Sequence, residues 1–213
     1  MRKVNPGLVV GLIGAIGFWL FSRSERGAAV IDEAVDYGAG AIDYGVDLMR
    51  LADDNVRAFL TLIAYSEGTE RAFDPYSVVY GYKHTIQNFS DHPAVTGEWR
   101  GERLSDAMCA AAGFGPGCIS TAAGRYQIIK PTWLQAKEAL GLTDFGPESQ
   151  DRAALWLIER GGAMDDVRAG RVGDAVMKVR RTWASLPGSG WSQPERSLPS
   201  LVAAYTAAGG TLA

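Results

Sequence analysis

A glutamate at the end of a predicted helix, Glu67, is the residue whose type and position best suit acid–base chemistry. It precedes Gly68 in the run Ala64-Tyr65-Ser66-Glu67-Gly68, and glycine supplies the left-handed residue that ends many helices. The helix dipole disfavours negative charge at this end, and Tyr65 can partly desolvate the carboxyl group. Both effects raise the pKa of a carboxyl group, as a general acid at neutral pH requires. Taken alone, the pattern also fits a solvent-exposed glutamate at a helix end.

The chain offers few other groups for catalysis or metal binding. Its two histidines, His84 and His92, are not spaced as a metal pair with a nearby cysteine or carboxylate. Eight residues separate Cys109 from Cys118, and a zinc site would need two further ligands of this kind. We therefore expect no metal and no cofactor. We expect a disulfide between the cysteines if the domain works outside the cytoplasm.

The elements that would position Glu67 can be predicted from apolar spacing and helix caps. Asp53 and Asp54 can cap a helix whose apolar positions 56, 59, 60, 63 and 64 form one buried face. Residues 77–82 have strand character, Pro131 starts a helix, and further helical patterns cover 147–160, 173–184 and 197–208. This order predicts an α+β fold, mainly helical with a small β-region, and a cleft between the two parts.

The charges divide the chain into three predicted pieces. Residues 1–29 sum to +3, residues 30–54 sum to −6, and the rest of the chain sums to zero, which gives the net charge of −3. We predict an N-terminal segment over residues 1–27, an acidic helical linker over 28–54 and a catalytic domain over 55–213. The net charge gives no electrostatic reason to expect a nucleic-acid partner.

The first piece has the composition of a membrane segment. Gly7 to Phe21 is uncharged, follows Arg2 and Lys3, and is followed by Arg23. As a helix it would be about 22 Å long, short of the roughly 30 Å hydrocarbon core of a bilayer. We expect a transmembrane anchor in the lipid bilayer, with the apolar region of a signal peptide and a buried core helix as alternatives.

The second piece contains a short repeat. The pentapeptide at residues 34–38 recurs seven residues later at 41–45, and the apolar positions fall on one side of a helix. An amphipathic spacer with a solvated acidic face is one interpretation of residues 30–54. A helix for self-association or for docking on a virion partner is the other.

At the third piece the sequence resembles the lambda type of phage lysozyme, a family of endolysins that act as lytic transglycosylases. The similarity runs in order through much of residues 58–211 and is carried by five stretches: Ala64 to Thr69, Ser90 to Pro93, Ala123 to Gln127, Leu140 to Asp151, and Trp183 to Gly188. The chain departs from the family in its N-terminal extension and in a longer insert near 98–119, which holds both cysteines.

The resemblance implies a lysozyme-like fold, bacterial peptidoglycan as substrate, and Glu67 as the sole catalytic carboxylate. It further implies that Tyr126 and Gln127 hold the sugar and that Tyr205 faces the acid. Asp74 and Tyr76 are additional candidates for substrate binding. The product of such an enzyme is a 1,6-anhydro sugar.

Two alternatives to this reaction stay open at this point. A true hydrolase would need a second carboxylate, for which Asp74 and Asp91 are the candidates. A membrane-anchored virion protein could instead bind glycan without cutting it. The predicted anchor and the resemblance together lead us to expect the domain in the periplasm on a membrane anchor, or at the membrane of a virion, with a role in host lysis or in wall penetration.

Overall fold

The computed structural model describes residues 53–191 and 193–213. The predicted membrane segment from Gly7 to Phe21 and almost all of the linker over 28–54 lie outside the described residues. Within the part that is described, no helix is both long enough and apolar enough to cross a membrane.

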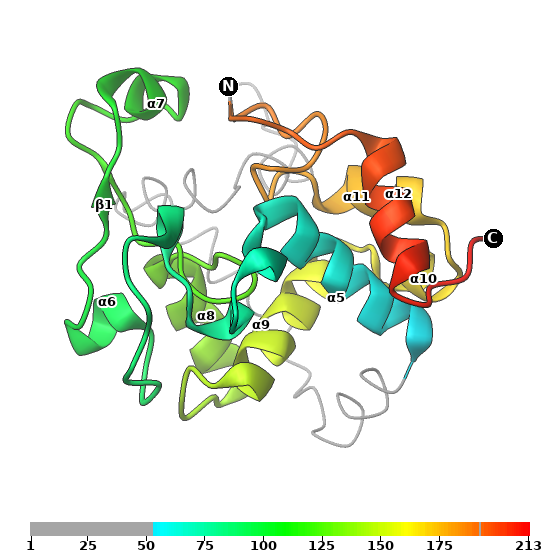
Figure 1. Ribbon diagram of the computed structural model, residues 1–213, viewed down its shortest axis with the longest axis horizontal. Helices are drawn as coiled ribbons and strands as arrows, with labels where there is room; N and C mark the ends of the chain where they lie inside the picture. The colour runs from blue at the N-terminus through cyan, green and yellow to red at the C-terminus, as the bar shows by residue number, and fades with distance from the viewer. Residues whose placement is uncertain (1–52, 192) are drawn as a thin grey trace, which may run out of the picture.

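The first described helix, α5 (Asp54–Glu67), lies at the centre of the domain (Figure 1). The carboxylate of Asp53 caps its start by accepting from the backbone N–H groups of Asn55 and Val56, and Gly68 ends it with φ of 76°. The sequence predicts one buried face, but the helix is buried on most sides. Its fully or nearly fully buried side chains are Val56, Ala58, Phe59, Leu60, Leu62, Ile63, Ala64 and Ser66.

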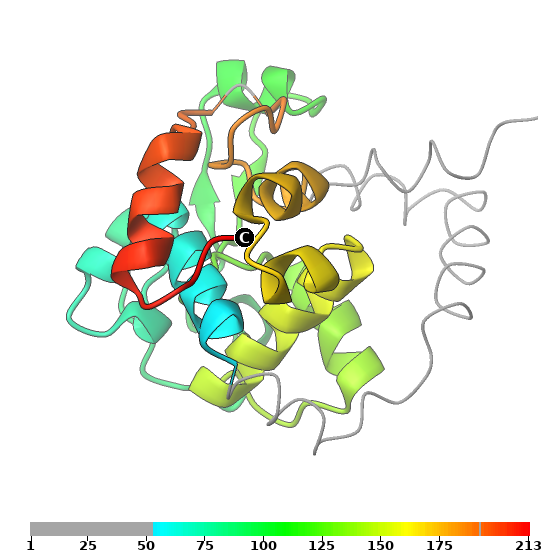
Figure 2. The same cartoon turned by 90° about the vertical axis from the view of Figure 1, so that its right-hand side faces the viewer.

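Five helices make up the rest of the helical part. They are α8 (Lys130–Leu140), α9 (Pro147–Arg160), α10 (Met164–Arg168), α11 (Val172–Val179) and α12 (Leu198–Ala207). Helices α9, α10 and α12 pack on α5, and α12 runs beside it in both views (Figures 1 and 2). The predicted starts at Pro131 and Pro147 agree with the structure to within one residue.

The helix predicted over 173–184 is wrong at its C-terminal end, because α11 stops at Val179. The chain turns there, with the N–H of Thr182 donating to the carbonyl of Val179 at 2.8 Å. The turn lets the indole of Trp183 bury itself and donate to the carbonyl of Tyr126 at 3.0 Å. A long-range contact therefore outweighs the local helical pattern.

The small β-region is less regular than the sequence predicts. Strand β1 (Glu102–Arg103) pairs antiparallel with β2 (Ile119–Ser120), and isolated bridges join Val78 to Thr85 and Val79 to Ala123. The strand predicted over 77–82 is wrong. Gly81 and Tyr82 have φ values of 63° and 58°, which no strand accommodates.

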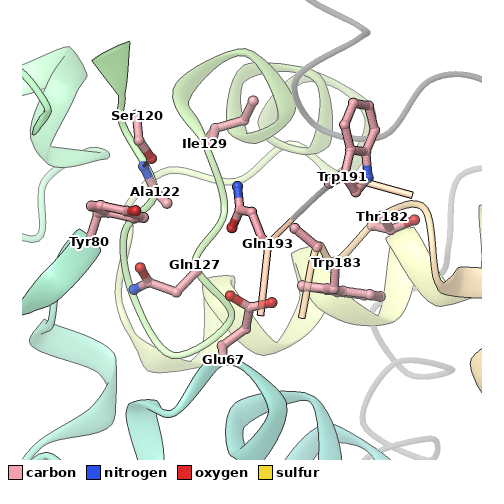
Figure 3. Close-up of a pocket in the computed structure, with 11 residues that line it drawn as sticks. Glu67, Tyr80, Ser120, Ala122, Gln127, Ile129, Thr182, Trp183, Trp191 and Gln193 are labelled. Carbon is pink, nitrogen blue, oxygen red and sulfur yellow. Dashed lines mark hydrogen bonds between the residues drawn. The ribbon is translucent and has the colours of Figure 1, made fainter. Parts of the chain in front are cut away.

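Short helical turns occupy the rest of this region. They are η1 (Thr69–Arg71), η2 (Pro75–Ser77), η3 (Tyr80–Tyr82) and α6 (Pro93–Thr96). Together with the bridges, they place Tyr80 and the segment 120–129 opposite the end of α5 (Figure 3).

The insert between β1 and β2 forms an arm that projects from the domain and carries α7 (Asp106–Ala111) (Figure 1). A disulfide joins Cys109 in α7 to Cys118 just before β2. Leu104, Cys109 and Ala112 are buried, but they do not belong to the main apolar core. The arm is therefore a separate small cluster, held together by its disulfide and by hydrogen bonds such as that from the N–H of Leu104 to the carbonyl of Cys118.

Replacing both Cys109 and Cys118 with serine should loosen the arm and leave the core intact. Closing a loop of this length stabilises a folded segment by about 2–3 kcal/mol, so amide exchange in the arm should accelerate on the order of 100-fold. Hydrogen-exchange mass spectrometry of residues 104–120 measures this effect, with α9 as the internal control. Equal acceleration in α9 would show that the disulfide stabilises the whole domain instead.

Candidate active site

A pocket opens between the β-region and the helical part, at the C-terminal end of α5 (Figure 3). Its walls come from α5, η3, β2, the turn that precedes α8, and the segment that follows α11. The lining residues are Glu67, Tyr80, Ser120, Ala122, Gln127, Ile129, Thr182, Trp183, Ala184, Trp191 and Gln193. Figure 3 shows the carboxyl group of Glu67 pointing into the space beside Gln127 and Gln193.

Glu67 occupies this place because α5 ends there. The left-handed Gly68 turns the chain away directly after it, so the last side chain of the helix points into the pocket. Burial raises the pKa of Glu67 to about 7, and hydrogen bonds from the side chain and backbone of Ser185 act in the opposite direction. The residue as a whole is partly exposed because it lines an open pocket, while its carboxyl group is enclosed.

The carboxyl group contacts a serine that lies 118 residues further along the chain. The hydroxyl of Ser185 donates to Oε1 of Glu67 at 2.6 Å and lies 2.9 Å from the hydroxyl oxygen of Ser66. The segment around Ser185 is anchored on both sides. Trp183 bonds to the carbonyl of Tyr126, and the N–H of Arg196 donates to the carbonyl of Ser185 at 2.8 Å.

Gln127 reaches the pocket on a tight turn. Gly124 has φ of 75°, and a Cβ there would lie 2.1 Å from Oε1 of Gln150, so only glycine fits. Gln150 Oε1 also accepts from the N–H of Arg125 at 2.9 Å, which fixes the turn on α9. The backbone of Gln127 has a positive φ of 47°. Its side-chain N–H donates to the carbonyl of Gly124 at 3.0 Å, which leaves the side-chain oxygen of Gln127 available to a ligand.

Tyr126 and Tyr76, both predicted to bind substrate, do not line the pocket. Tyr126 is fully buried and donates to Asp151 Oδ1 at 2.5 Å, and the hydroxyl of Tyr76 donates to the same carboxylate at 2.9 Å. Arg125 completes the group by donating to the hydroxyl oxygen of Tyr76 at 2.7 Å and to Thr61 on α5 at 3.2 Å. Asp151 is partly buried, so its carboxylate needs hydrogen-bond donors from the protein, and the side chains that supply them connect α5, α9 and the turn.

Tyr205 and Asp74 also lie away from the pocket. Tyr205 is fully buried on α12, and its hydroxyl donates to the carbonyl of Thr211 at 3.2 Å. Burial raises the pKa of Tyr205, and the negative charge of Asp53 raises it further. Asp53 lies at the opposite end of α5 from Glu67, so Tyr205 is far from the acid. Asp74 caps η2 by accepting from the N–H of Tyr76 at 3.0 Å.

Asp91 serves the fold and not the pocket. It accepts from the indole of Trp133 at 2.7 Å and from Lys137 at 2.5 Å. Burial acts to raise its pKa, but these hydrogen bonds and the N–H of His92 lower it below the usual value. His92 is itself buried, with its Nε2 3.0 Å from the carbonyl of Ile128, and burial lowers its pKa to about 4. Glu67 is thus the one carboxylate among the described residues that line the pocket.

Several lining residues were not predicted from the sequence, namely Tyr80, Ser120, Thr182, Trp191 and Gln193. Trp191 and Gln193 belong to a loop that Glu195 stabilises by accepting from the N–H groups of Gly188 and Ser189. No spacing along the chain relates these residues to Glu67.

Over residues 53–191 and 193–213, no group of three or more histidine, cysteine, aspartate or glutamate side chains could hold a metal ion.

The raised pKa of Glu67 predicts a pH-dependent cost to stability. The unfolded chain ionises Glu67 near 4.5, whereas the folded protein keeps the proton up to about 7, so wild-type stability falls as pH rises through this window. Glu67→Gln should match the wild type at pH 4 and exceed its unfolding free energy by up to about 3 kcal/mol at pH 8. Urea denaturation at both pH values measures the difference, and a gap that is independent of pH would contradict the expectation.

Comparison with known proteins agrees with this geometry. A family model described as endolysin matches residues 57–212. The endolysin of Escherichia phage P2 is 40% identical over 73% of this chain and 93% of its own length, and that of Escherichia phage lambda is 35% identical over 73% and 92%. The structure of bacteriophage lambda lysozyme complexed with a chitohexasaccharide superposes with a TM-score of 0.63 at 34% identity, covering 75% of this chain and 97% of that one. A second structure of the lambda lysozyme gives 0.60 at 33% identity, with the same coverage. The predicted lysozyme-like fold is therefore confirmed, and the chain belongs to the endolysin family.

Proposed function

We propose that the protein cleaves the glycan strands of bacterial peptidoglycan as a lytic transglycosylase, with Glu67 as both acid and base. The observation that carries the proposal is the one carboxyl group that residues 53–191 and 193–213 contribute to the pocket, whose pKa burial raises to about 7. Such a group holds a proton at neutral pH and can also take one back once it has given it away. The lambda lysozyme structure complexed with a chitohexasaccharide supports a glycan as the ligand.

The reaction needs two proton transfers by one residue. Protonated Glu67 donates its proton to the oxygen of the glycosidic bond, and this bond breaks. The C6 hydroxyl of the same muramic acid residue then attacks C1, and ionised Glu67 accepts the hydroxyl proton. The product is a 1,6-anhydro sugar, no water is consumed, and the enzyme returns to its starting protonation state.

A hydrolase would need a second carboxylate within about 5–9.5 Å of the first, to act as nucleophile or to activate water. The two candidates have other partners. Asp91 binds Trp133 and Lys137, and Asp74 caps η2. This absence of a second carboxylate among the lining residues favours the transglycosylase over the hydrolase.

The rest of the pocket suits an amino-sugar chain. Tyr80 and Trp191 offer aromatic faces, and such rings pack well against the apolar faces of sugars (Figure 3). Gln127 and Gln193 offer amide groups that can bond to acetamido and hydroxyl groups. The alternative of a protein that binds glycan without cutting it leaves the raised pKa of Glu67 without a role.

The products of digestion test this proposal. Purified peptidoglycan treated with the enzyme should release anhydro-muropeptides, each lighter by one water than the product of a hydrolase. Mass spectrometry distinguishes the two, and Glu67→Gln, shown to be folded by circular dichroism, should release neither because an amide cannot donate the proton. Reducing-end muramic acid as the sole product would establish a hydrolase, and no release by the wild type would favour a binding protein.

We also propose that residues 1–27 anchor the enzyme in a membrane, with the domain over 55–213 acting in the periplasm or at a virion membrane. The support comes from the sequence alone. Gly7 to Phe21 is uncharged and lies between basic residues, whereas residues 30–54 are too acidic to enter hydrocarbon. The linker would hold the domain away from the surface, and its repeat could pair with a second copy or a virion partner.

Removing residues 1–49 should separate localisation from chemistry. The full-length chain should sediment with membranes, while the shortened protein should stay in the supernatant and cleave purified peptidoglycan at the wild-type rate. A short span with several glycines should also be extracted more easily than a leucine-rich one. Full-length protein that remains soluble without detergent would rule out the anchor, and a folded but inactive truncation would place the linker in the active site.

A further inference from the structure

Two buried serines connect the carboxyl group of Glu67 to the backbone of its own helix. The hydroxyl of Ser66 lies 2.8 Å from the carbonyl oxygen of Ile63, the hydroxyl of Ser185 lies 2.9 Å from that of Ser66, and Glu67 Oε1 lies 2.6 Å from Ser185. Ser66 and Ser185 are only 4% and 9% exposed, so water does not replace these contacts easily.

Each of the two serines has only one hydroxyl proton to donate in this chain of oxygens. A carbonyl oxygen can only accept, so Ser66 uses its one proton on Ile63. The single proton of Ser185 then has two acceptors, Ser66 Oγ and Glu67 Oε1, and can be given to one of them at a time.

We propose that Ser185 is a positioning residue whose hydroxyl proton turns between Glu67 Oε1 and Ser66 Oγ as the charge on Glu67 changes. The inference rests on the proposed role of Glu67 as acid and base. Ser185 keeps its own proton throughout. The transferred protons are the one that Glu67 gives to the glycosidic oxygen and the one that it takes from the attacking hydroxyl.

Each position of the hydroxyl suits one half of the reaction. When Glu67 is ionised, the Ser185 hydroxyl donates to a charged acceptor, and 2.6 Å is a normal distance for such a bond. When Glu67 is protonated, that acceptor loses its charge, and Ser66 becomes a comparable partner. Ser185 therefore stabilises the carboxylate as it forms, and its hydroxyl turns away once Glu67 is protonated again. Because Ser185 donates to Oε1 of the ionised carboxylate, the returning proton is directed to Oε2.

The surroundings restrict the change to a rotation of one hydroxyl group. The carbonyl of Ser185 accepts from Arg196, and the preceding carbonyl of Ala184 accepts from the hydroxyl of Ser189 at 2.9 Å. Ser66 is fixed within α5. The acceptors are thus held in place before the reaction begins, which is the condition for electrostatic stabilisation without reorganisation.

Two arginines on the elements around Glu67 have other partners. Arg196 stacks on Tyr65, with Cζ 5.2 Å from the ring centroid, and Arg125 is engaged with Tyr76 and Asp151. Other ionisable groups on these elements are Tyr80 and Tyr82 of η3, Glu70 and Arg71 of η1, Glu148, Asp151, Arg152, Glu159 and Arg160 of α9, Arg180, Arg181 and Glu195 beside the segment of Ser185, Asp53, Asp54 and Arg57 at the far end of α5, Tyr205 of α12, and Asp165, Asp166 and Arg168 of α10. The hydroxyl of Tyr82 donates to the carbonyl of Gly68. The influences on the pKa of Glu67 are burial and Ser185, and no charged neighbour is among them.

The two serines give opposite expectations, which separates a hydroxyl switch from a general loosening of the site. Ser185→Ala removes the side-chain donor to the carboxylate and keeps the backbone bond from residue 185, so the pKa of Glu67 should rise by about 0.5–1 unit. Ser66→Ala removes the competing acceptor, so Ser185 donates to Glu67 alone and the pKa should fall by a similar amount. The alkaline limb of the pH profile of kcat/KM should move in the same two directions, because the protonated acid is the active form.

The direct measurement is an NMR titration of the side-chain carboxyl carbon of Glu67 in 13C-labelled protein, assigned by its loss in Glu67→Gln. Ser185→Thr, which keeps the hydroxyl, should titrate like the wild type. Ser189→Ala is a matched control, since Ser189 is a buried serine of the same loop that bonds to Ala184 and Glu195. It should leave the Glu67 titration unchanged. If Ser185→Ala does not fold, Ser185→Cys should produce the same upward shift, because a thiol is a weak donor.

Shifts of the same sign in Ser66→Ala and Ser185→Ala, or no shift in either, would overturn the switch. So would a shift in Ser189→Ala as large as that in Ser185→Ala. The titration does not depend on lytic activity, so its outcome is separate from that of the proposed function. Lysis by folded Glu67→Gln would refute the catalytic role alone, and unmoved titrations with an inactive Glu67→Gln would refute the switch alone.

Discussion

The burial of one carboxyl group at the end of a core helix is the constraint on which the rest of this structure depends. Helix α5 is enclosed on most sides, and its last residue, Glu67, faces a pocket in which burial partly desolvates its carboxyl group. An ionised carboxyl there costs stability, and the dipole of the helix adds to the cost. The apolar packing of α5 offsets this cost, and the left-handed Gly68 keeps the carboxyl in place by ending the helix directly after it. This packing therefore gives the folded protein a carboxyl group whose pKa is raised to about 7.

The walls of the pocket depend on a second, partly buried carboxylate. Asp151 on α9 accepts hydrogen bonds from Tyr76 and Tyr126, and Arg125 links the same group to α5. These bonds fix the turn that carries Gln127 into the pocket. The aromatic residues beside the turn therefore act as scaffold, whereas the aromatic surface open to a sugar comes from Tyr80 and Trp191. Acidic side chains elsewhere are likewise used by the fold, as Asp91 is by Lys137 and Trp133. A chemistry that needs one carboxylate fits such a site better than one that needs two.

Local patterns in the sequence determined the helices well, because caps and periodicity are local properties. Asp53 and Gly68 set the ends of α5, and prolines set the starts of α8 and α9. The same local pattern made Glu67 a candidate, as a carboxylate at a helix end next to an aromatic residue, and the resemblance to the lambda type of phage lysozyme selected it as the acid. The strand predicted over 77–82 failed because Gly81 and Tyr82 adopt positive φ, which β-forming side chains alone do not reveal.

The tertiary structure alone decided which side chains surround Glu67. Tyr126 and Gln127 are neighbours in sequence, yet Tyr126 is buried and donates to Asp151, whereas Gln127 lines the pocket. Tyr205 was expected to face the acid, but α12 runs along α5 so that its hydroxyl lies on the carbonyl of Thr211. Ser185 reaches Glu67 across 118 residues. The sequence by itself determined Glu67 as a carboxylate at a helix end, and the ends of α5 and the starts of α8 and α9, since these rest on residues within a few positions of one another. Contacts between distant segments depend on how the whole core packs, and no local spacing encodes them.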